Sequence, residues 1–314
     1  MYILPLDQIT VQDASRVGGK ALSLGELVRA GLNVPPGIVV TTDAYRAFVE
    51  LNGLKREHDD LLAHPELNDP KFKARITNFR ARLVTLPLPD DIARALGDAL
   101  RDWVPVHTMA VRSSALAEDL PDNSFAGQYD TFLNQRGLPQ ILDAVKKCWA
   151  SLWNERALVY RASSGLARDN VAMGVIIQLQ VAATASGVMF TLDPLSGHET
   201  EMVIEATWGL GEALVSGHVT PDHFVVDWLE GKIITKQIAD KGMMVAFAAD
   251  ENEQARGEEG RGYESETPAE KRFEPSLTDV QTLALASLGE RIMAHYGAPQ
   301  DIEWSFGHIA DSTG

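Results

Sequence analysis

The sequence predicts an α/β protein of two lobes, and two observations support this fold class. Helical periods alternate along the chain with short apolar segments of strand character, an order typical of layered α/β folds. The chain has 314 residues, enough to bury a large core, and this size commonly gives two lobes rather than one. We expect an N-terminal lobe over residues 1–181 and a C-terminal lobe over residues 182–314.

The first lobe begins with a glycine turn that leads into an amphipathic helix over residues 16–31. We expect Leu22, Leu24 and Leu27 on the inward face of this helix, and Gly31 at its end. A rigid Pro-Pro turn then introduces a β-branched strand that ends near Thr42.

Further along the first lobe, the pattern predicts one strand and one long helix. The strand covers residues 108–112, and the helix covers residues 142–162. Cys148 lies on the apolar side of this helix, so we expect a packed, inert thiol. With one cysteine, the chain can form no internal disulfide, which fits a reducing compartment.

The second lobe is expected to begin near Gly187 and to contain strands over residues 202–205 and 223–227. Residues 250–274 are rich in Glu, Gly and Arg and poor in apolar side chains, which predicts a surface excursion. Thr278 and Gln281 form a capping-box pattern, so the last helix should start there and run to about Tyr296.

Arg112 is the first candidate for phosphate binding. It follows an apolar strand and precedes a loop of small residues, and its planar, permanently charged fork suits phosphate oxygens. The loop comprises Ser124, Phe125, Ala126, Gly127 and Gln128, and its small turn residues would let backbone N–H groups approach the same oxygens. An alternative is that Gly127 merely permits a turn between two strands.

Lys20 is the second candidate. It would stand in the first turn of the N-terminal helix, where free N–H groups and the helix dipole favour an anion. The spacing is not that of a P-loop, and a solvated lysine is the alternative interpretation.

Asp301 and Glu303 are candidates for metal binding. Alternation along a strand would place both carboxylates on one face, with Ile302 on the other. Two carboxylates can share a Mg²⁺ ion, which prefers oxygen ligands and bridges them to nucleotide phosphates. The alternative is a polar, solvent-facing sheet edge.

These segments occur in one order along the chain, and together they resemble the N-terminal ATP-grasp domain of the phosphoenolpyruvate synthase family. That family includes rifampin phosphotransferase and the ATP-binding subunit of phenylphosphate synthase. The resemblance runs nearly end to end and rests on Val17–Lys20, Val34–Gly37, Ala110–Ala115, Ala117–Pro121, Ser124–Gln128, Thr131–Asn134, Ser186–Pro194, Trp208–Glu212, Val215–Asp222 and Asp301–Trp304.

The resemblance implies a two-lobed ATP-grasp fold that binds ATP between its lobes. It implies that Lys20 and Arg112 bind phosphates and act in catalysis, and that the loop of residues 124–128 closes over the phosphates. It also implies that Asp301 and Glu303 hold Mg²⁺. The adenine edge would be read at Gln178, Leu179, Gln180 and Val181, where Gln180 replaces the methionine that is common in the family. Glu212 and Lys241 complete the candidate nucleotide-binding residues, and Gly242 stands where the family often has a second lysine.

Two family features are absent from this sequence. The family continues after Asp-Ile-Glu-Trp with a strand carrying Gln-x-Arg-Pro, whereas this chain ends at Gly314, so we expect its ATP site to be incomplete. The family also transfers phosphoryl groups through a histidine in a Thr-x-His-Ala-like motif on a swivelling domain, and none of the eight histidines here has that setting. His218 and His223 lack a second ligand at helical spacing for zinc.

Composition excludes some partner classes. The formal net charge is −16, and no basic stripe exists to release counterions from nucleic acid or to contact anionic lipid. No run approaches the roughly 18 apolar residues that a membrane span requires, and the N-terminus lacks a basic-then-apolar signal. We therefore expect a cytoplasmic protein without nucleic-acid or membrane partners.

The resulting hypothesis is the ATP-binding domain of a dikinase-type phosphotransferase resembling pyruvate, water dikinase. The terminal pyrophosphoryl group of ATP would pass to a histidine on a swivelling domain. One phosphate would then go to water, and the other to an acceptor held by an acceptor-binding domain, with both domains on the same protein or on a separate subunit. AMP and phosphate would be released. Two alternatives stay open: an ATP-grasp ligase joining a carboxylate to an amine with ADP as product, and a non-catalytic ATP-sensing subunit.

Overall fold

A computed structural model describes residues 1–63, 65–116, 119–120, 123–124, 129–163, 171–194, 196–215, 217, 219–246 and 262–311. By its internal contacts the described chain divides into two compact units, residues 1–180 with 311 and residues 181–310. Both units combine antiparallel sheets with helices, which confirms the mixed α/β fold class.

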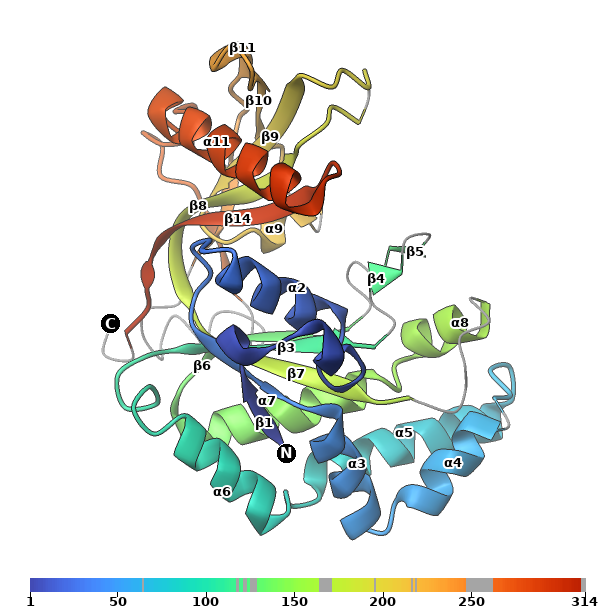
Figure 1. Cartoon of the computed structure of the whole chain (residues 1–314). Helices are drawn as coiled ribbons and strands as arrows, with labels where there is room; N and C mark the ends of the chain where they lie inside the picture. The colour runs from blue at the N-terminus through green and yellow to red at the C-terminus, as the bar shows by residue number, and fades with distance from the viewer. Residues whose placement is uncertain are drawn as a thin grey trace. The chain divides into compact units, whose positions relative to one another are not determined.

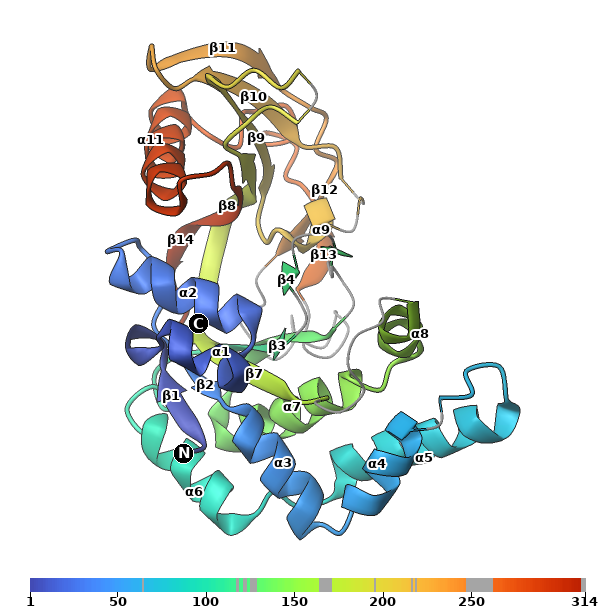
Figure 2. The same cartoon turned by 45° about the vertical axis from the view of Figure 1, so that its right-hand side comes forward.

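The first unit is built around a five-stranded antiparallel sheet with strand order β1-β2-β7-β3-β6. Helices α1 and α2 lie on one face of this sheet and α7 lies on the other (Figures 1 and 2). The main strands and helices of the unit are β1 (Ile3–Pro5), α1 (Ala14–Val17), α2 (Gly19–Arg29), β2 (Gly37–Val40), α3 (Thr42–Leu51), α4 (Lys55–Ala63), α5 (Pro70–Thr85), α6 (Asp90–Ala99), β3 (Met109–Ala115), β6 (Thr131–Gln135), α7 (Gly137–Ser151), α8 (Glu155–Ser163) and β7 (Met173–Leu179). Short elements complete it: η1 (Leu6–Gln8), η2 (Val11–Asp13), β4 (Asp119–Leu120) and β5 (Asn123–Ser124).

The inward face of α2 differs in part from the expected one. Ala21 and Gly25 are buried, whereas Leu22, Leu24 and Leu27 are only partly buried. The reason is a close approach: a Cβ on Gly25 would lie 2.9 Å from both the Ile9 Cβ and the Leu6 carbonyl oxygen. Small residues therefore form the closest contact of α2, and the predicted inward position is confirmed for Leu22 and Leu24, which pack against the same core as partly buried side chains.

The expected helix over residues 142–162 is two helices, α7 and α8, separated at residues 152–154. Ile141, Val145, Cys148 and Trp149 are fully buried, so the prediction of a packed thiol is confirmed. The helices on this side of the sheet share an aromatic cluster in which Trp153 Nε1 donates to the Tyr45 hydroxyl oxygen at 3.1 Å. Desolvation by burial raises the pKa of that tyrosine.

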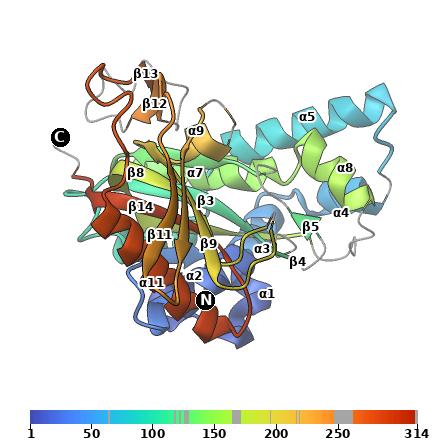
Figure 3. The same cartoon turned by 90° about the horizontal axis from the view of Figure 1, so that it is seen from above.

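The second unit has its own five-stranded antiparallel sheet, in the order β11-β10-β9-β8-β14. Helix α11 packs on one face, where Met189, Met202, Ile204, Phe224 and Leu285 are buried together (Figures 1 and 3). The elements of this unit are β8 (Val181–Phe190), β9 (Glu201–Trp208), α9 (Glu212–Val215), β10 (Asp222–Asp227), β11 (Lys232–Gln237), β12 (Met243–Ala246), β13 (Tyr263–Glu266), α11 (Asp279–Tyr296) and β14 (Asp301–Ile309).

The capping-box prediction for the last helix is confirmed. Thr278 is the N-cap of α11, its hydroxyl accepts the Gln281 backbone N–H, and Gly297 ends the helix in the left-handed conformation. Of the predicted surface excursion over residues 250–274, residues 262–274 are described, and residues 268–274 are exposed as expected, but the segment also contains a strand that was not predicted. Residues 263–266 form β13, which pairs with β12 in a small sheet beside α9 (Figure 2).

The charges of the sequence are divided unevenly between the two units. Residues 1–180 contain 21 acidic and 20 basic residues, whereas residues 181–310 contain 22 acidic and 8 basic residues. The second unit therefore carries nearly all of the net negative charge.

Candidate nucleotide-binding site

Arg112 lies in the middle of β3 rather than at a strand end, because this strand continues to Ala115. Its backbone is paired on both sides, with Thr131 on β6 and Ile176 on β7. The side-chain Nε atom is buried and has no hydrogen-bond partner in the described part of the chain. A buried guanidinium nitrogen without an acceptor suits an anionic ligand, because an unmet buried donor costs free energy.

Lys20 occupies the second position of α2, as the sequence predicted for a residue of the first helical turn. The next residue, Ala21, donates its backbone N–H to the Ser114 hydroxyl oxygen at 3.0 Å. Ser114 stands two positions after Arg112 on β3, so the structure brings the helix turn with Lys20 to the strand that carries Arg112.

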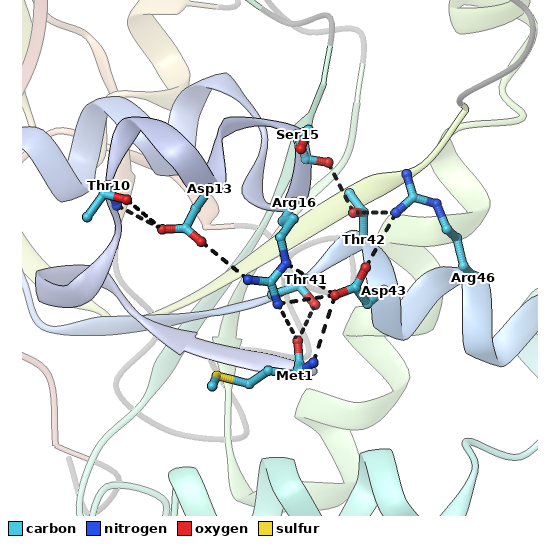
Figure 4. A network of polar contacts seen from close by, with 9 residues as sticks. All are labelled: Met1, Thr10, Asp13, Ser15, Arg16, Thr41, Thr42, Asp43 and Arg46. Atoms are coloured by element: carbon cyan, nitrogen blue, oxygen red, sulfur yellow. Dashed lines mark hydrogen bonds and ion pairs between the residues drawn. The ribbon is translucent and has the colours of Figure 1, made fainter.

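A polar network holds α1, the short helix that precedes Lys20 (Figure 4). Arg16 donates Nε and Nη2 to Asp43 Oδ2 at 3.2 and 3.1 Å, and Nη2 also donates to the Met1 carbonyl oxygen at 2.9 Å. Its Nη1 donates to Asp13 Oδ1 at 3.3 Å. Backbone and side-chain hydrogen bonds from Thr10, followed by the Arg16 charge, keep the pKa of Asp13 below its usual value. The network fixes the start of the turn that ends at Lys20.

The loop expected to close over phosphates cannot be placed. Phe125, Ala126, Gly127 and Gln128 lie outside the described residues, and Ser124 is described only as part of the two-residue strand β5. Their role stays a prediction.

The segment expected to read the adenine edge spans the end of β7 and the start of β8. Gln178 and Gln180 are buried, and their side-chain amides bond within the first unit. Gln178 Nε2 donates to the Pro35 carbonyl oxygen at 2.8 Å, and Gln180 Oε1 accepts the Asn134 backbone N–H at 2.6 Å. Leu179 donates its backbone N–H to the Pro36 carbonyl oxygen, and Val181 opens β8. These contacts hold the backbone of the segment in a defined conformation.

Asp301 and Glu303 lie on the same face of β14, as alternation predicted. Both are exposed, whereas Ile302 and Trp304 pack against the core under α11. Glu303 pairs across the ladder with Val188, which pairs with Glu205, which pairs with His223. The sheet face opposite α11 therefore carries carboxylates on β14 and β9, with β8 between these two strands.

His223 Nδ1 lies 2.6 Å from Glu205 Oε1 on this face. Within the described residues, no group of three or more His, Cys, Asp or Glu side chains could hold a metal ion. Two exposed carboxylates on one strand face are compatible with Mg²⁺, because that ion is commonly held by one or two carboxylates, with water and phosphate oxygens as its other ligands. The metal role of Asp301 and Glu303 stays a prediction. His218 lies outside the described residues.

Lys241 has a different environment from the one that its assignment to ATP implies. Its side chain is fully buried, and Nζ donates to Asp222 Oδ1 at 2.5 Å and to the Ala239 carbonyl oxygen at 3.2 Å. Asp222 is also fully buried and accepts three more hydrogen bonds, from the Ala239 N–H and from the N–H and hydroxyl of Ser276. The lysine ammonium is thus committed to contacts inside the second unit.

Glu212 is the first residue of α9, and its Oε2 accepts the Gly262 backbone N–H at 3.3 Å. The preceding residues 209–210 are fixed to β12, since Leu210 donates its backbone N–H to the Val245 carbonyl oxygen at 2.8 Å. The glycine-containing segment before Glu212 is therefore held against β12.

Sequence reasoning missed Ser114, Asp222 and Ser276. Asp222 and Ser114 lie in segments that the resemblance quoted, but neither has a local pattern that reveals its partner. The signal for Asp222 was its place at the start of a strand with alternating burial, where a carboxylate on the inward face requires a buried cation.

Comparison with known protein families decides the identity of this fold. The family model described as pyruvate phosphate dikinase, AMP/ATP-binding domain, matches residues 14–312. The chain belongs to this family. The match covers both units and all of the candidate residues.

Curated relatives of this AMP/ATP-binding domain carry two different names. A probable phosphoenolpyruvate synthase of Methanothermobacter thermautotrophicus is 40% identical over 97% of this chain and 44% of its own length. A phosphoenolpyruvate synthase of Aeropyrum pernix is 38% identical over 96% of this chain and 40% of its own. A rifampicin phosphotransferase of Bacillus subtilis is 40% identical over 96% of this chain and 34% of its own. The chain thus spans less than half the length of these relatives.

The described helices of this domain are all too short or too polar to span a bilayer.

Proposed function

We propose that this chain binds MgATP and serves as the ATP-binding domain of a dikinase-type phosphotransferase. The observation that carries the proposal is the buried Arg112 Nε without a hydrogen-bond partner in the described residues, on the strand that also contacts the helix turn of Lys20. Membership of a family described as AMP/ATP-binding supports a nucleotide as the anion.

In this proposal the residues of the chain act by positioning and charge neutralisation. Lys20 and Arg112 bind phosphate oxygens and offset the charge that develops on them during transfer. Asp301 and Glu303 hold Mg²⁺, which when bound neutralises phosphate charge and orients the phosphate oxygens. The loop of residues 124–128 covers the phosphates, the backbone of residues 178–181 binds the adenine edge, and Glu212 is a further nucleotide contact.

Lys241 receives another role in this proposal. Because its ammonium is buried against Asp222, it supports the second unit rather than contacting ATP directly. A direct contact would require breaking a buried ion pair, which is costly.

The proposed reaction transfers the terminal pyrophosphoryl group of ATP to a histidine on another domain and releases AMP. Water then takes one phosphate from the pyrophosphohistidine, and the remaining phosphohistidine gives its phosphoryl group to an acceptor. The relatives named phosphoenolpyruvate synthase and rifampicin phosphotransferase share this domain at similar identity, which supports a common ATP-binding part with acceptors chosen elsewhere. Their greater length leaves room for the histidine-bearing and acceptor-binding domains that we propose as partners.

Calorimetric titration of the 314-residue chain with MgATP tests the proposal. We expect micromolar binding that Lys20→Ala and Arg112→Ala each weaken by about tenfold or more, as charge-assisted hydrogen bonds require. Arg94→Ala is the control, because Arg94 is an exposed arginine on α6. The proposal fails if the chain binds no nucleotide, or if the control weakens binding as much as the two test variants.

The identity of the nucleotide product separates the proposed reaction from an ATP-grasp ligase. With a histidine domain of a relative supplied in trans, we expect AMP and phosphate. ADP formed without a histidine domain would favour the ligase, and tight binding without turnover would favour an ATP sensor. Arg112→Ala should reduce turnover by orders of magnitude with little change in thermal stability, and a matching loss of stability would assign Arg112 a structural role instead.

A further inference from the structure

We infer that Ser114 is a positioning residue of the nucleotide site, whose hydroxyl holds the helix turn with Lys20 against the strand with Arg112. The inference rests on the proposed function, since it concerns how the two phosphate-binding cations are held. In this proposal Ser114 does not contact the phosphates that Lys20 and Arg112 bind. It acts through the backbone of α2.

The first observation is an unusual helix cap. Ser114 is fully buried, and its Oγ accepts the Ala21 backbone N–H at 3.0 Å across a separation of 93 residues. Ala21 is the third residue of α2, the position whose N–H an N-cap side chain ordinarily satisfies. The N-cap of α2 is Gly18, which has no side chain to donate or accept, so the cap comes from β3.

The second observation explains why the helix cannot cap itself. Gly18 has φ +83°, and a Cβ at this position would lie 2.2 Å from the Ser114 carbonyl oxygen. A serine, threonine or aspartate at position 18 would therefore push the helix away from the strand. The close contact between Gly18 and Ser114 therefore excludes a capping side chain at position 18. The hydroxyl of Ser114 takes its place as the acceptor for the Ala21 N–H.

The third observation connects this contact to the cations. Ser114 and Arg112 are two positions apart on β3 and so share one face of the strand, about 7 Å apart along it. Lys20 is the immediate neighbour of Ala21 on α2. One buried hydrogen bond thus sets the register between the turn with Lys20 and the strand with Arg112.

Fixing this register has a physical purpose. Two cations that bind adjacent phosphate oxygens repel each other before the ligand arrives, so the fold must hold them in place. The Arg16 network holds the far end of the turn at α1 (Figure 4). The Ser114 hydroxyl holds its near end at α2. Preorganised cations bind a phosphate without reorganisation at the moment of binding.

The experiment compares Ser114→Ala with Ser113→Ala in the 314-residue chain. Ser113 is a matched control because it is also buried on β3 but alternates to the opposite face of the strand, away from α2. We expect Ser114→Ala to weaken MgATP affinity several-fold, about three- to tenfold, while Ser113→Ala leaves it within about twofold, as a lost cap shifts the helix turn without removing a phosphate ligand.

A double-mutant cycle with Lys20→Ala tests whether Ser114 acts through Lys20. If it does, Ser114→Ala costs little affinity in the Lys20→Ala background, and the two effects are far from additive. A structural residue that merely stabilises the domain would give additive losses of affinity, and that result would overturn the inference.

Hydrogen exchange of the Ala21 amide supplies a readout that needs no nucleotide. Ser114→Ala should increase exchange at Ala21 by tenfold or more relative to Ser113→Ala. Unchanged exchange, or equal ATP affinity of both serine variants while the unsubstituted chain binds ATP, would overturn the role of Ser114 alone. Absence of ATP binding by the unsubstituted chain would instead overturn the proposed function, and with it this inference.

Discussion

Lys241 offers a sharp test of how the second unit is held together. Its ammonium and the Asp222 carboxylate are both fully buried, with Nζ and Oδ1 2.5 Å apart. Asp222 bonds in addition to Ala239 and Ser276, so one carboxylate joins β10, the turn after β11 and the segment before α11. Lys241→Met removes the charge of the lysine, keeps most of its apolar length, and leaves the carboxylate without its cation.

The structure also sets the expected magnitude. Breaking a buried ion pair by removing one partner typically costs about 3–5 kcal/mol, because the other charge stays buried and uncompensated. The matched control is Lys236→Met, which breaks the pair between Lys236 Nζ and Asp279 Oδ1 at 2.6 Å. Those side chains are 35% and 64% exposed, so this control should cost less than about 1 kcal/mol.

Thermal unfolding of the two variants measures the difference. We expect Lys241→Met to lower the midpoint of the transition of the second unit by on the order of 10 °C, and Lys236→Met to lower it by no more than about 3 °C. Equal midpoints for the two variants would refute the buried-pair reasoning. A large loss of ATP affinity in Lys241→Met with an unchanged midpoint would return Lys241 to the list of nucleotide contacts.

Two further predictions concern protonation and metal binding. Desolvation by burial lowers the pKa of His58, and Asp59 opposes this only in part. The neutral imidazole therefore stabilises the fold fully above about pH 6.5. As the pH is lowered below that value, the free energy of unfolding should decrease, because the unfolded chain binds the proton more tightly than the folded chain. Chemical unfolding of His58→Gln over the same pH range should show a smaller decrease. Parallel curves for the two proteins would contradict the prediction. Asp301→Asn and Glu303→Gln should each raise the Mg²⁺ concentration required for ATP binding by about tenfold, without lowering the unfolding midpoint, since both side chains are exposed. Glu230→Gln, an exposed control in the same unit, should change neither quantity, and an equal effect of this control would indicate general electrostatics rather than metal binding.

The sequence predicted local features well where one period or one cap decides them. Alternation placed Asp301 and Glu303 on one face of β14, and the Thr278–Gln281 pattern identified the start of α11. Both are set by residues within a few positions of one another, so no knowledge of the tertiary fold is needed.

Prediction failed where a distant segment decides the packing. Leu22 and Leu24 of α2 pack against the core as expected, but the sequence did not reveal that the approach of Ile9 and Leu6 places Ala21 and Gly25 at the closest contact. The sequence near Lys241 does not reveal its burial, because its partner Asp222 is 19 residues away and the adjacent Asp240 pairs with Arg272 instead. Ser276, which also binds Asp222, lies beyond β13. A pairing across such separations is fixed by the fold of the sheet.

The candidate site shows the same contrast between features set by nearby residues and features set by distant ones. Family resemblance selected Lys20 and Arg112, and the structure relates them through a residue that no sequence pattern marks, Ser114. A serine in a strand is ordinarily unremarkable, and its value here depends on a glycine N-cap 96 positions earlier along the chain.

The uneven distribution of charge has a kinetic consequence for an anionic ligand. The first unit is nearly neutral, whereas the second contains 22 acidic and 8 basic residues, so a polyanion diffusing toward this protein meets a repulsive field at long range. Attraction by two cations acts only over the last few ångströms. Added monovalent salt screens this repulsion, and at physiological ionic strength the screening length is about 8–10 Å. The rate of encounter with nucleotide should therefore rise as salt is added up to physiological ionic strength. Proteins that attract anions by electrostatic steering show the reverse behaviour.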